Sequence, residues 1–261
     1  NLMAQKPKSK MIKKVKTKKK GLTKADVVRK GKQLSNWGKW GKNDELGVLN
    51  YIKPQDIVDA AKLIKKGKVF RLGLELDENG PQNGLFGGRW NPLHHMMATG
   101  TDAVAGNQDK TVGLRYADDF INLPTQCASQ WDALAHVFAG DKMWNGYNAS
   151  LVDSTGAHKN GIEKFSNKMV GRGVLLDVAK YKKKNRLADG YGITINDLNR
   201  TAKSQGVSIK RGDFVIINTG QMADCLDRGE WGEYGAGAAP GLALEPVDWT
   251  HEKEITGICS D

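Results

Sequence analysis

The polar residues best suited to chemistry in this 261-residue chain lie in one short segment, residues 126–136 (QCASQWDALAH). Asp132 and His136 are four positions apart, and on a helix such residues share a face, with about 5–6 Å between their Cβ atoms. A carboxylate and an imidazole at that distance can bind one metal ion or form an acid–base pair. Gln126 and Gln130 can converge with them on an extended or turning segment. The same spacing also suits a surface ion pair, or a buried histidine that has found a hydrogen-bond partner.

The elements around this segment predict an α/β fold. Glycines bound an apolar run at residues 170–178, as expected of a buried strand, and residues 210–217 read as a turn followed by a second one. Between them, Thr194 can cap a helix that ends before Gly206. Upstream, helical spacing of apolar residues predicts a helix over residues 54–65, and alternation predicts a strand over residues 68–76.

The charge distribution divides the chain into two parts. Residues 1–32 contain 13 Lys and Arg against one acidic residue, which leaves 27 basic and 28 acidic residues in the remainder. Such a charge block predicts a disordered tail. Residues 33–261 show no internal repeat, so we expect one domain that folds from near Trp37. Its last apolar run, residues 255–259, reads as a core strand, and we therefore expect the domain to be truncated at its C-terminus.

Composition excludes several classes of protein. A body that is near neutral argues against a nucleic-acid partner, although the tail alone could contact nucleic acid or an anionic membrane. No run reaches the roughly 18–20 apolar residues of a membrane span. The three cysteines contain no CxxC and predict neither a disulfide framework nor a cysteine-based zinc site. We expect a cytoplasmic protein; residues 1–5 could be the remnant of a signal peptide, which leaves export open.

The segment 126–136 resembles the cyclase / kynurenine formamidase-like family of metal-dependent hydrolases, in a bacterial branch with the form QCATQWDALSH. The family motif is HxGTHxDxPxH, in which two histidines and the aspartate bind the metal and the last histidine carries the proton. Asp132 and His136 match it. The departures are Gln126 and Gln130 at the two ligand histidines, and Ala128, Ser129 and Leu134 at the other marked positions. The resemblance spans about residues 35–261, including 37–47, 94–102 (HHMMATGTD), 173–179 (GVLLDVA), 210–220 (KRGDFVIINTG) and 239–242.

This resemblance implies a single swivelling β/β/α domain of the kynurenine formamidase/cyclase type, assembled as a homo-oligomer. It implies that Asp132, Gln126 and Gln130 bind a divalent metal ion, zinc or manganese, and that His136 is the catalytic residue. An amide oxygen is a weaker zinc ligand than an imidazole, so the two glutamines put zinc in doubt and favour a harder ion such as Mn²⁺ or Mg²⁺. The family also takes a His and a Glu from its C-terminal region, which would lie beyond Asp261.

The implied reaction is hydrolysis of a small amide, such as an N-formyl aromatic amine in an arylformamidase. The alternatives are a dienelactone-type lactone hydrolase of the same fold, and a metal-free binding protein that has kept the fold without the chemistry. For the small-molecule substrate we single out His94, His95, Trp131 and Arg115. The two histidines could instead supply a metal ligand or pack beside the following methionines, Trp131 could be a core residue, and Arg115 could form a surface ion pair.

Overall fold

The computed structural model describes residues 22–110 and 113–261, in two compact units. The described part of the first unit, residues 22–35, contains helix α1, which runs from Lys24 to Gln33. It begins with a reciprocal cap, in which Thr23 Oγ1 accepts from the Asp26 N–H and the Asp26 carboxylate accepts from the Thr23 N–H. The last part of the predicted disordered tail is therefore helical. Its residues 1–21 lie outside the described residues.

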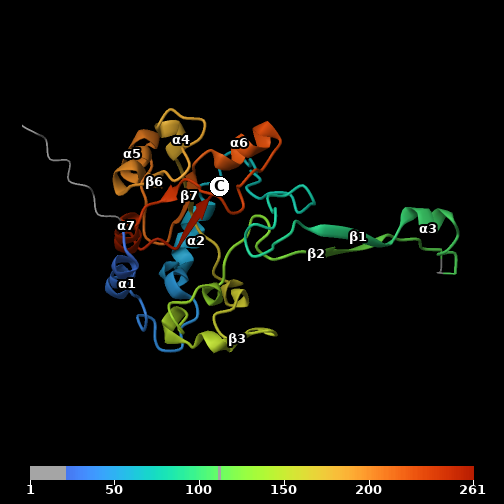
Figure 1. Ribbon diagram of the computed structural model, residues 1–261, viewed down its shortest axis with the longest axis horizontal. Coiled ribbons are helices and arrows are strands. Elements are labelled where there is room, and N and C mark those ends of the chain that lie inside the picture. The colour runs from blue at the N-terminus through green and yellow to red at the C-terminus, as the bar shows by residue number, and fades with distance from the viewer. Residues whose placement is uncertain (1–21, 111–112) are drawn as a thin grey trace, which may run out of the picture. The chain divides into compact units, whose positions relative to one another are not determined.

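The second unit, residues 36–261, is built on a three-stranded parallel sheet with the order β5-β7-β9. These strands are Gly173–Asp177, Phe214–Asn218 and Gly257–Ser260. Helix α5 (Ile195–Gln205) connects β5 to β7, and α6 (Gln221–Arg228) and α7 (Pro246–Glu252) lie between β7 and β9. Strand, helix and strand therefore occur where the sequence predicted them. The sheet with its crossover helices is a mixed α/β arrangement (Figure 1).

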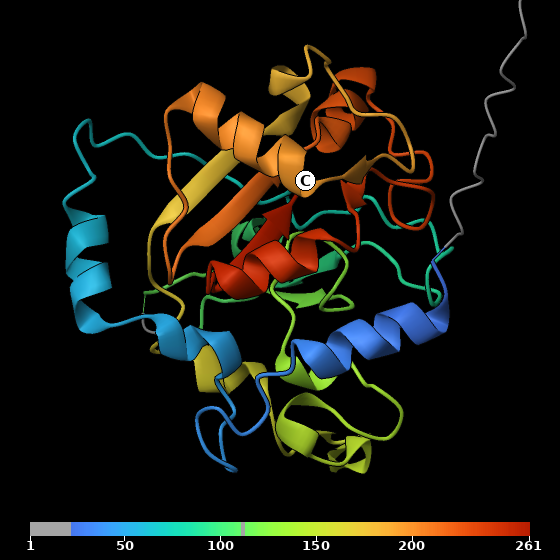
Figure 2. The same ribbon diagram turned by 90° about the vertical axis from the view of Figure 1, so that its left-hand side faces the viewer.

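The main core lies on one face of this sheet. Alternate residues of β5 and β7 point into it and meet α5 and α7, which cover the same face in Figure 2. Helix α5 begins at a Thr194 capping box and ends at Gly206, whose φ of 67° suits a glycine. The main core includes Val174, Leu176, Val215, Ile217, Leu198, Ala202 and Trp249. Short elements complete this region: α4 (Val178–Tyr181), β6 (Gly192–Ile193) and β8 (Gly241–Leu242), which pairs in parallel with β6.

The region before the sheet departs from the sequence prediction at one point. Helix α2 (Pro54–Ala61) is present but shorter than predicted. Within the described part of the chain, residues 68–76 form no strand, so that prediction was wrong. Alternation indicates a strand only where a neighbour can pair with it, and here Val69, Phe70 and Leu72 remain 66–90% exposed. One bond anchors this segment: the Leu74 N–H donates to Ser129 Oγ at 3.0 Å.

An antiparallel hairpin, β1 (Leu93–Ala98) and β2 (Asp118–Asn122), extends away from the sheet and carries α3 (Gly100–Val104) near its far end (Figure 1). A second, small hairpin joins β3 (Val152–Asp153) to β4 (Gly156–Ala157). The other elements are short 3₁₀ helices, of which Leu134–His136 matters for the site. Across the residues described, no helix combines the length and apolar character that crossing a bilayer requires.

We predict that deleting residues 1–32 lowers the melting temperature of the protein by less than about 2 °C. The segment carries a net charge of +12, from 13 basic residues against one acidic residue, and no residue of α1 is buried. Thermal unfolding followed by circular dichroism measures this. Leu176→Ala is the control, because this fully buried side chain should cost about 3 kcal/mol of unfolding free energy when truncated. A deletion that destabilises as much as Leu176→Ala would contradict the prediction.

Candidate active site

The segment 126–136 is a loop that ends in a 3₁₀ turn, and small buried residues hold it in place. Cys127, Ala133 and Ala135 are buried, with Ala135 only 1% exposed. The Ala135 N–H donates to the Asn160 carbonyl at 3.1 Å, and the His136 N–H donates to Ala133 at 3.1 Å. Because the small residues point inward, the polar residues between them point outward. The segment is not an α-helix, yet the turn still brings Asp132 and His136 together.

Of the three predicted metal ligands and the predicted catalytic residue, three side chains form one cluster: Gln126, Asp132 and His136. His136 Nδ1 lies 3.1 Å from Asp132 Oδ1 and 3.0 Å from Gln126 Nε2. The Gln126 amide nitrogen also donates to Asp132 Oδ1. Side chains of Asp132 and His136 are 48% and 41% exposed, so the pair is open to solvent and to a ligand. A carboxylate that orients an imidazole in this way is the arrangement of a general-base dyad.

Sequence reasoning missed a fourth member of the cluster, Arg89. Its guanidinium donates to Gln126 Oε1 and lies over the Phe86 ring, with Cζ 4.5 Å from the ring centroid. Arg89 follows the glycine-rich loop of residues 77–88, where no periodicity or motif distinguishes it from a solvated arginine. Only the folded chain brings it next to a glutamine 37 positions away.

Opposing effects set the ionisation of Asp132. Burial disfavours the carboxylate, but the hydrogen bonds from Gln126 and His136 and the positive charge of Arg89 outweigh it, so the pKa of Asp132 lies below its ordinary value. The group is therefore a carboxylate at neutral pH. It can accept a hydrogen bond from the Nδ1–H group of His136 and can stabilise the positive charge of that side chain when it is an imidazolium.

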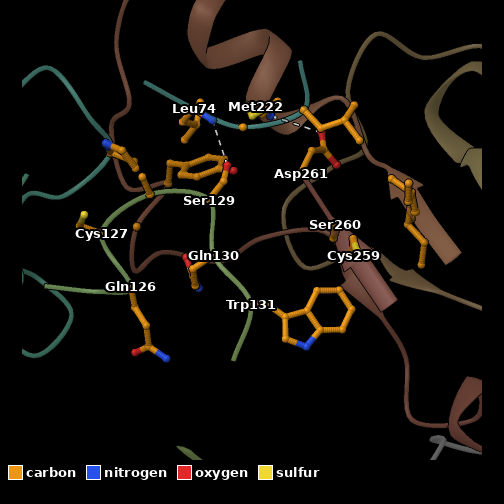
Figure 3. Close-up of a pocket in the computed structure, with 18 of the residues that line it drawn as sticks. Leu74, Gln126, Cys127, Ser129, Gln130, Trp131, Met222, Cys259, Ser260 and Asp261 are labelled. Atoms are coloured by element: carbon orange, nitrogen blue, oxygen red, sulfur yellow. Dashed lines mark hydrogen bonds between the residues drawn. The ribbon is translucent and has the colours of Figure 1, made fainter. Parts of the chain in front are cut away.

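A cavity of about 760 Å³ adjoins this cluster, on the sheet face opposite the core. Leu175, Ile216 and Cys259 form one row across its floor, because each is in register with the next on β5, β7 and β9. The segment 126–136, which we call the motif loop, forms another wall through its residues 126–131. Figure 3 shows Gln126, Gln130 and Trp131 on one side of this space and Cys259 and Asp261 across from them. Gln126 thus belongs to both the cavity and the cluster, whereas Asp132 and His136 lie beyond the cavity lining.

Trp131 joins the loop to the sheet. Its ring meets Phe214 edge-on at 5.7 Å, and a Cβ at Gly257 would overlap the indole. A glycine at this position of β9 therefore lets the aromatic ring reach the sheet. Of the predicted substrate-binding residues, Trp131 alone lines the cavity.

The remaining three candidates lie elsewhere, on or beside the β1–β2 hairpin. His94 bonds to the Asp119 carboxylate across the hairpin, and the His95 ring lies 5.4 Å from that of Phe120. Arg115 forms a salt bridge with Asp109. The structure therefore gives each of them a partner on this arm and does not bring them to the cavity. Their predicted role in substrate binding remains a prediction.

The arrangement is a poor fit to the divalent metal ion implied by the resemblance. Among residues 22–110 and 113–261, no group of three or more His, Cys, Asp and Glu side chains could hold one. Gln126 presents its N–H₂ group, not its carbonyl oxygen, to Asp132 and His136. An amide nitrogen has no lone pair to give to a metal. A metal ion bound here thus remains a prediction.

The far end of the cavity contains a second carboxylate, Asp261. Its side chain accepts from the Thr219 N–H at 2.6 Å and from the Met222 N–H at 3.4 Å, near the start of α6. Tyr234 lines the same cavity. Burial, helped by the negative charges of Asp261 and Cys225, raises the pKa of Tyr234 to about 12.

Known proteins resemble this chain in sequence and in fold. The Cyclase family model matches residues 51–261. A crystal structure described as a novel cyclase has a TM-score of 0.80 and 38% identity, covering 87% of this chain and 76% of that one. An isatin hydrolase bound to the product analogue thioisatinate has a TM-score of 0.52 and 16% identity, over 80% of this chain and 73% of that one, so this likeness concerns the fold alone. No curated protein matches the chain.

We predict that Tyr234 ionises only near pH 12, above the ordinary tyrosine pKa of about 10. Below about pH 10 it is protonated in both the folded and unfolded states; from there to about pH 12 only the unfolded chain loses the proton, so folding stability falls as pH rises. Tyrosinate absorbance during an alkaline titration measures the ionisation. In Tyr234→Phe the late component should be missing, and stability should fall less steeply over the same pH window. Loss of the Tyr234 proton near pH 10 would contradict the assignment.

Proposed function

Because the chain belongs to the Cyclase family, which confirms the resemblance found in its sequence, we propose that it is a hydrolase of small amides and cyclic esters, of the arylformamidase type. The observation that carries the proposal is the Asp132–His136 contact of 3.1 Å, beside a cavity large enough for a small aromatic molecule. In support, one protein of similar fold is an isatin hydrolase.

The proposed chemistry uses the two polar side chains in sequence. Asp132 accepts a hydrogen bond from the Nδ1–H group of His136, which leaves Nε2 unprotonated and free to act as a base. Nε2 takes a proton from water as the water oxygen attacks the substrate carbonyl carbon. The same nitrogen then returns the proton to the departing amine or alkoxide, and the acid and the amine or alcohol leave. During the step the imidazolium is stabilised by the Asp132 carboxylate, whose lowered pKa keeps it charged.

The cavity supports an aromatic or cyclic substrate. Leu175, Ile216 and Trp131 offer apolar surface, while Gln126 and Gln130 place amide groups at its edge near the reacting pair. Apolar walls with few polar groups are typical of small-molecule sites. N-formyl aryl amines and aryl lactones share this combination of a flat ring and one reactive carbonyl, so the same site serves either class.

Asp132→Ala should abolish hydrolysis with little loss of stability, because the carboxylate is half exposed and its partners are polar. His136→Ala should lower kcat by about a hundredfold or more, the usual scale for a lost general base. Hydrolysis of formanilide and of dihydrocoumarin, followed by absorbance, measures both effects.

The chain provides a matched control. Asp153 and His158 form an exposed pair of the same kind, with Asp153 Oδ2 2.9 Å from His158 Nε2, and neither lines the cavity. Asp153→Ala should leave the rate unchanged. Full activity in Asp132→Ala would overturn the proposal, and would favour a binding protein that has kept the fold without the chemistry.

The hairpin is the surface through which the proposed homo-oligomer forms. A two-stranded ribbon is marginally stable alone, and this one exposes apolar side chains on both faces, among them Met97 at 66% and Phe120 at 49%. Burying them against a second copy of the chain stabilises both.

We therefore expect Met97→Glu combined with Phe120→Glu to shift the protein to a lower mass in light scattering coupled to size-exclusion chromatography. A charge buried in an apolar interface is costly unless it is paired. Val170→Glu, at an equally exposed position away from the hairpin, should not change the mass. An oligomer that survives the double substitution, or a monomeric parent protein, would show that the hairpin does not assemble the chain.

A further inference from the structure

We infer that Arg89 takes the place of a divalent metal ion as the positive charge of this site, by locking Gln126 in an orientation that excludes a metal. The catalytic meaning of this inference rests on the proposed hydrolase function, but its central test does not. Arg89 acts through Gln126, so it is a positioning residue.

The orientation of the Gln126 amide follows from its partners. A guanidinium only donates hydrogen bonds, so the atom that faces Arg89 must be the carbonyl oxygen, Oε1. The N–H₂ group then faces Asp132 Oδ1 and His136 Nδ1. Turning the amide over would set N–H₂ against the guanidinium and a carbonyl oxygen against the carboxylate. Both changes replace an attraction with a repulsion.

This orientation fills the space where a cation would bind. A metal held by Asp132 Oδ1 and His136 Nδ1 would need a lone pair on each atom, but Nδ1 carries the proton that it donates to Oδ1, and Oδ1 also accepts from Gln126 Nε2. In the resembling family a histidine that gives its lone pair to the metal stands at position 126. Here the glutamine instead donates to Asp132 Oδ1 and places its amide nitrogen 3.0 Å from His136 Nδ1. Hydrogen bonds and the charge of Arg89 therefore take the place of metal ligation in this cluster.

Arg89 also supplies the charge that such a cluster needs. Among the described residues it forms no salt bridge, and its positive charge contributes to keeping Asp132 ionised. An arginine does not lose its proton at any physiological pH. Contact with the Phe86 ring at 4.5 Å holds the guanidinium in place without neutralising it. A divalent ion entering the cluster would be repelled by this fixed charge.

Metal binding tests the inference directly. Isothermal titration of the full chain with Zn²⁺ and with Mn²⁺ should show no site that depends on Asp132, as judged by comparison with Asp132→Asn. A second comparison uses Gln126→His with Gln130→His, which restores two imidazoles. Adding Arg89→Met to that pair should tighten Zn²⁺ binding at least about tenfold, because the repelling charge is gone. Circular dichroism confirms that each variant is folded, and Arg89→Gln, which also removes the charge, replaces Arg89→Met if the latter is not.

Two results would overturn the inference: one equivalent of Zn²⁺ or Mn²⁺ bound by the unmodified protein and lost in Asp132→Asn, or equal Zn²⁺ affinity with and without Arg89 in the histidine variant. Binding that survives Asp132→Asn lies elsewhere and leaves the inference standing. These readouts need no substrate, so a protein without hydrolase activity would refute the proposed function and not the role of Arg89. If activity is found, it should resist EDTA, and Arg89→Lys should retain more of it than Arg89→Met.

Discussion

The packing of Trp131 against the sheet is the interaction on which the site depends. The indole reaches Phe214 on β7 and the bare backbone of Gly257 on β9, and it belongs to an apolar cluster with Leu49 and Ile52. This contact holds the motif loop at a fixed distance from the open sheet face, and the cavity is the space between them. The same contact helps to position Gln126 and His136, which lie on either side of Trp131 in the sequence. An aromatic residue inside the candidate motif therefore has a structural role as well as a place in the cavity lining.

The elements that the sequence predicted well are those whose own residues determine them. Helix α5 has a capping threonine, helical spacing and a terminal glycine within one segment, and β7 is a short apolar run behind a turn. The strand expected at residues 255–259 is present as β9 (Gly257–Ser260), at the edge of the sheet, but none of its four residues is buried, so the expectation of a buried core strand was wrong. Residues 68–76 have an equally clear alternation, but pairing requires a neighbour, and that information lies outside the segment. The swivelling arrangement of the whole domain likewise depends on contacts between distant segments, and it remains a prediction.

The site shows the same division between local and distant information. Spacing alone brought Asp132 and His136 together, although a 3₁₀ turn and not an α-helix does so. The orientation of Gln126 could not be predicted, because it depends on Arg89, and a loop without periodicity gives no sign of where its side chains will lie. The positions of His94 and His95 could not be predicted for a related reason: the hairpin that contains them pairs with itself and extends away from the sheet, so their predicted role in substrate binding remains a prediction.

Exposure of Asp132 and His136 to solvent weakens the attraction between them when no substrate is bound. With Asp132 and His136 each nearly half exposed, water screens their attraction and competes for their hydrogen bonds. An apolar substrate in the cavity beside Gln126 would displace that water, and the attraction between carboxylate and imidazolium would then strengthen, since it acts through a medium of lower dielectric constant. Arg89 is already half-buried against Phe86 and needs no such change. In the proposed mechanism, Arg89 therefore supplies a fixed charge, whereas the surroundings of the proton carrier, His136, are completed only when a substrate displaces the water.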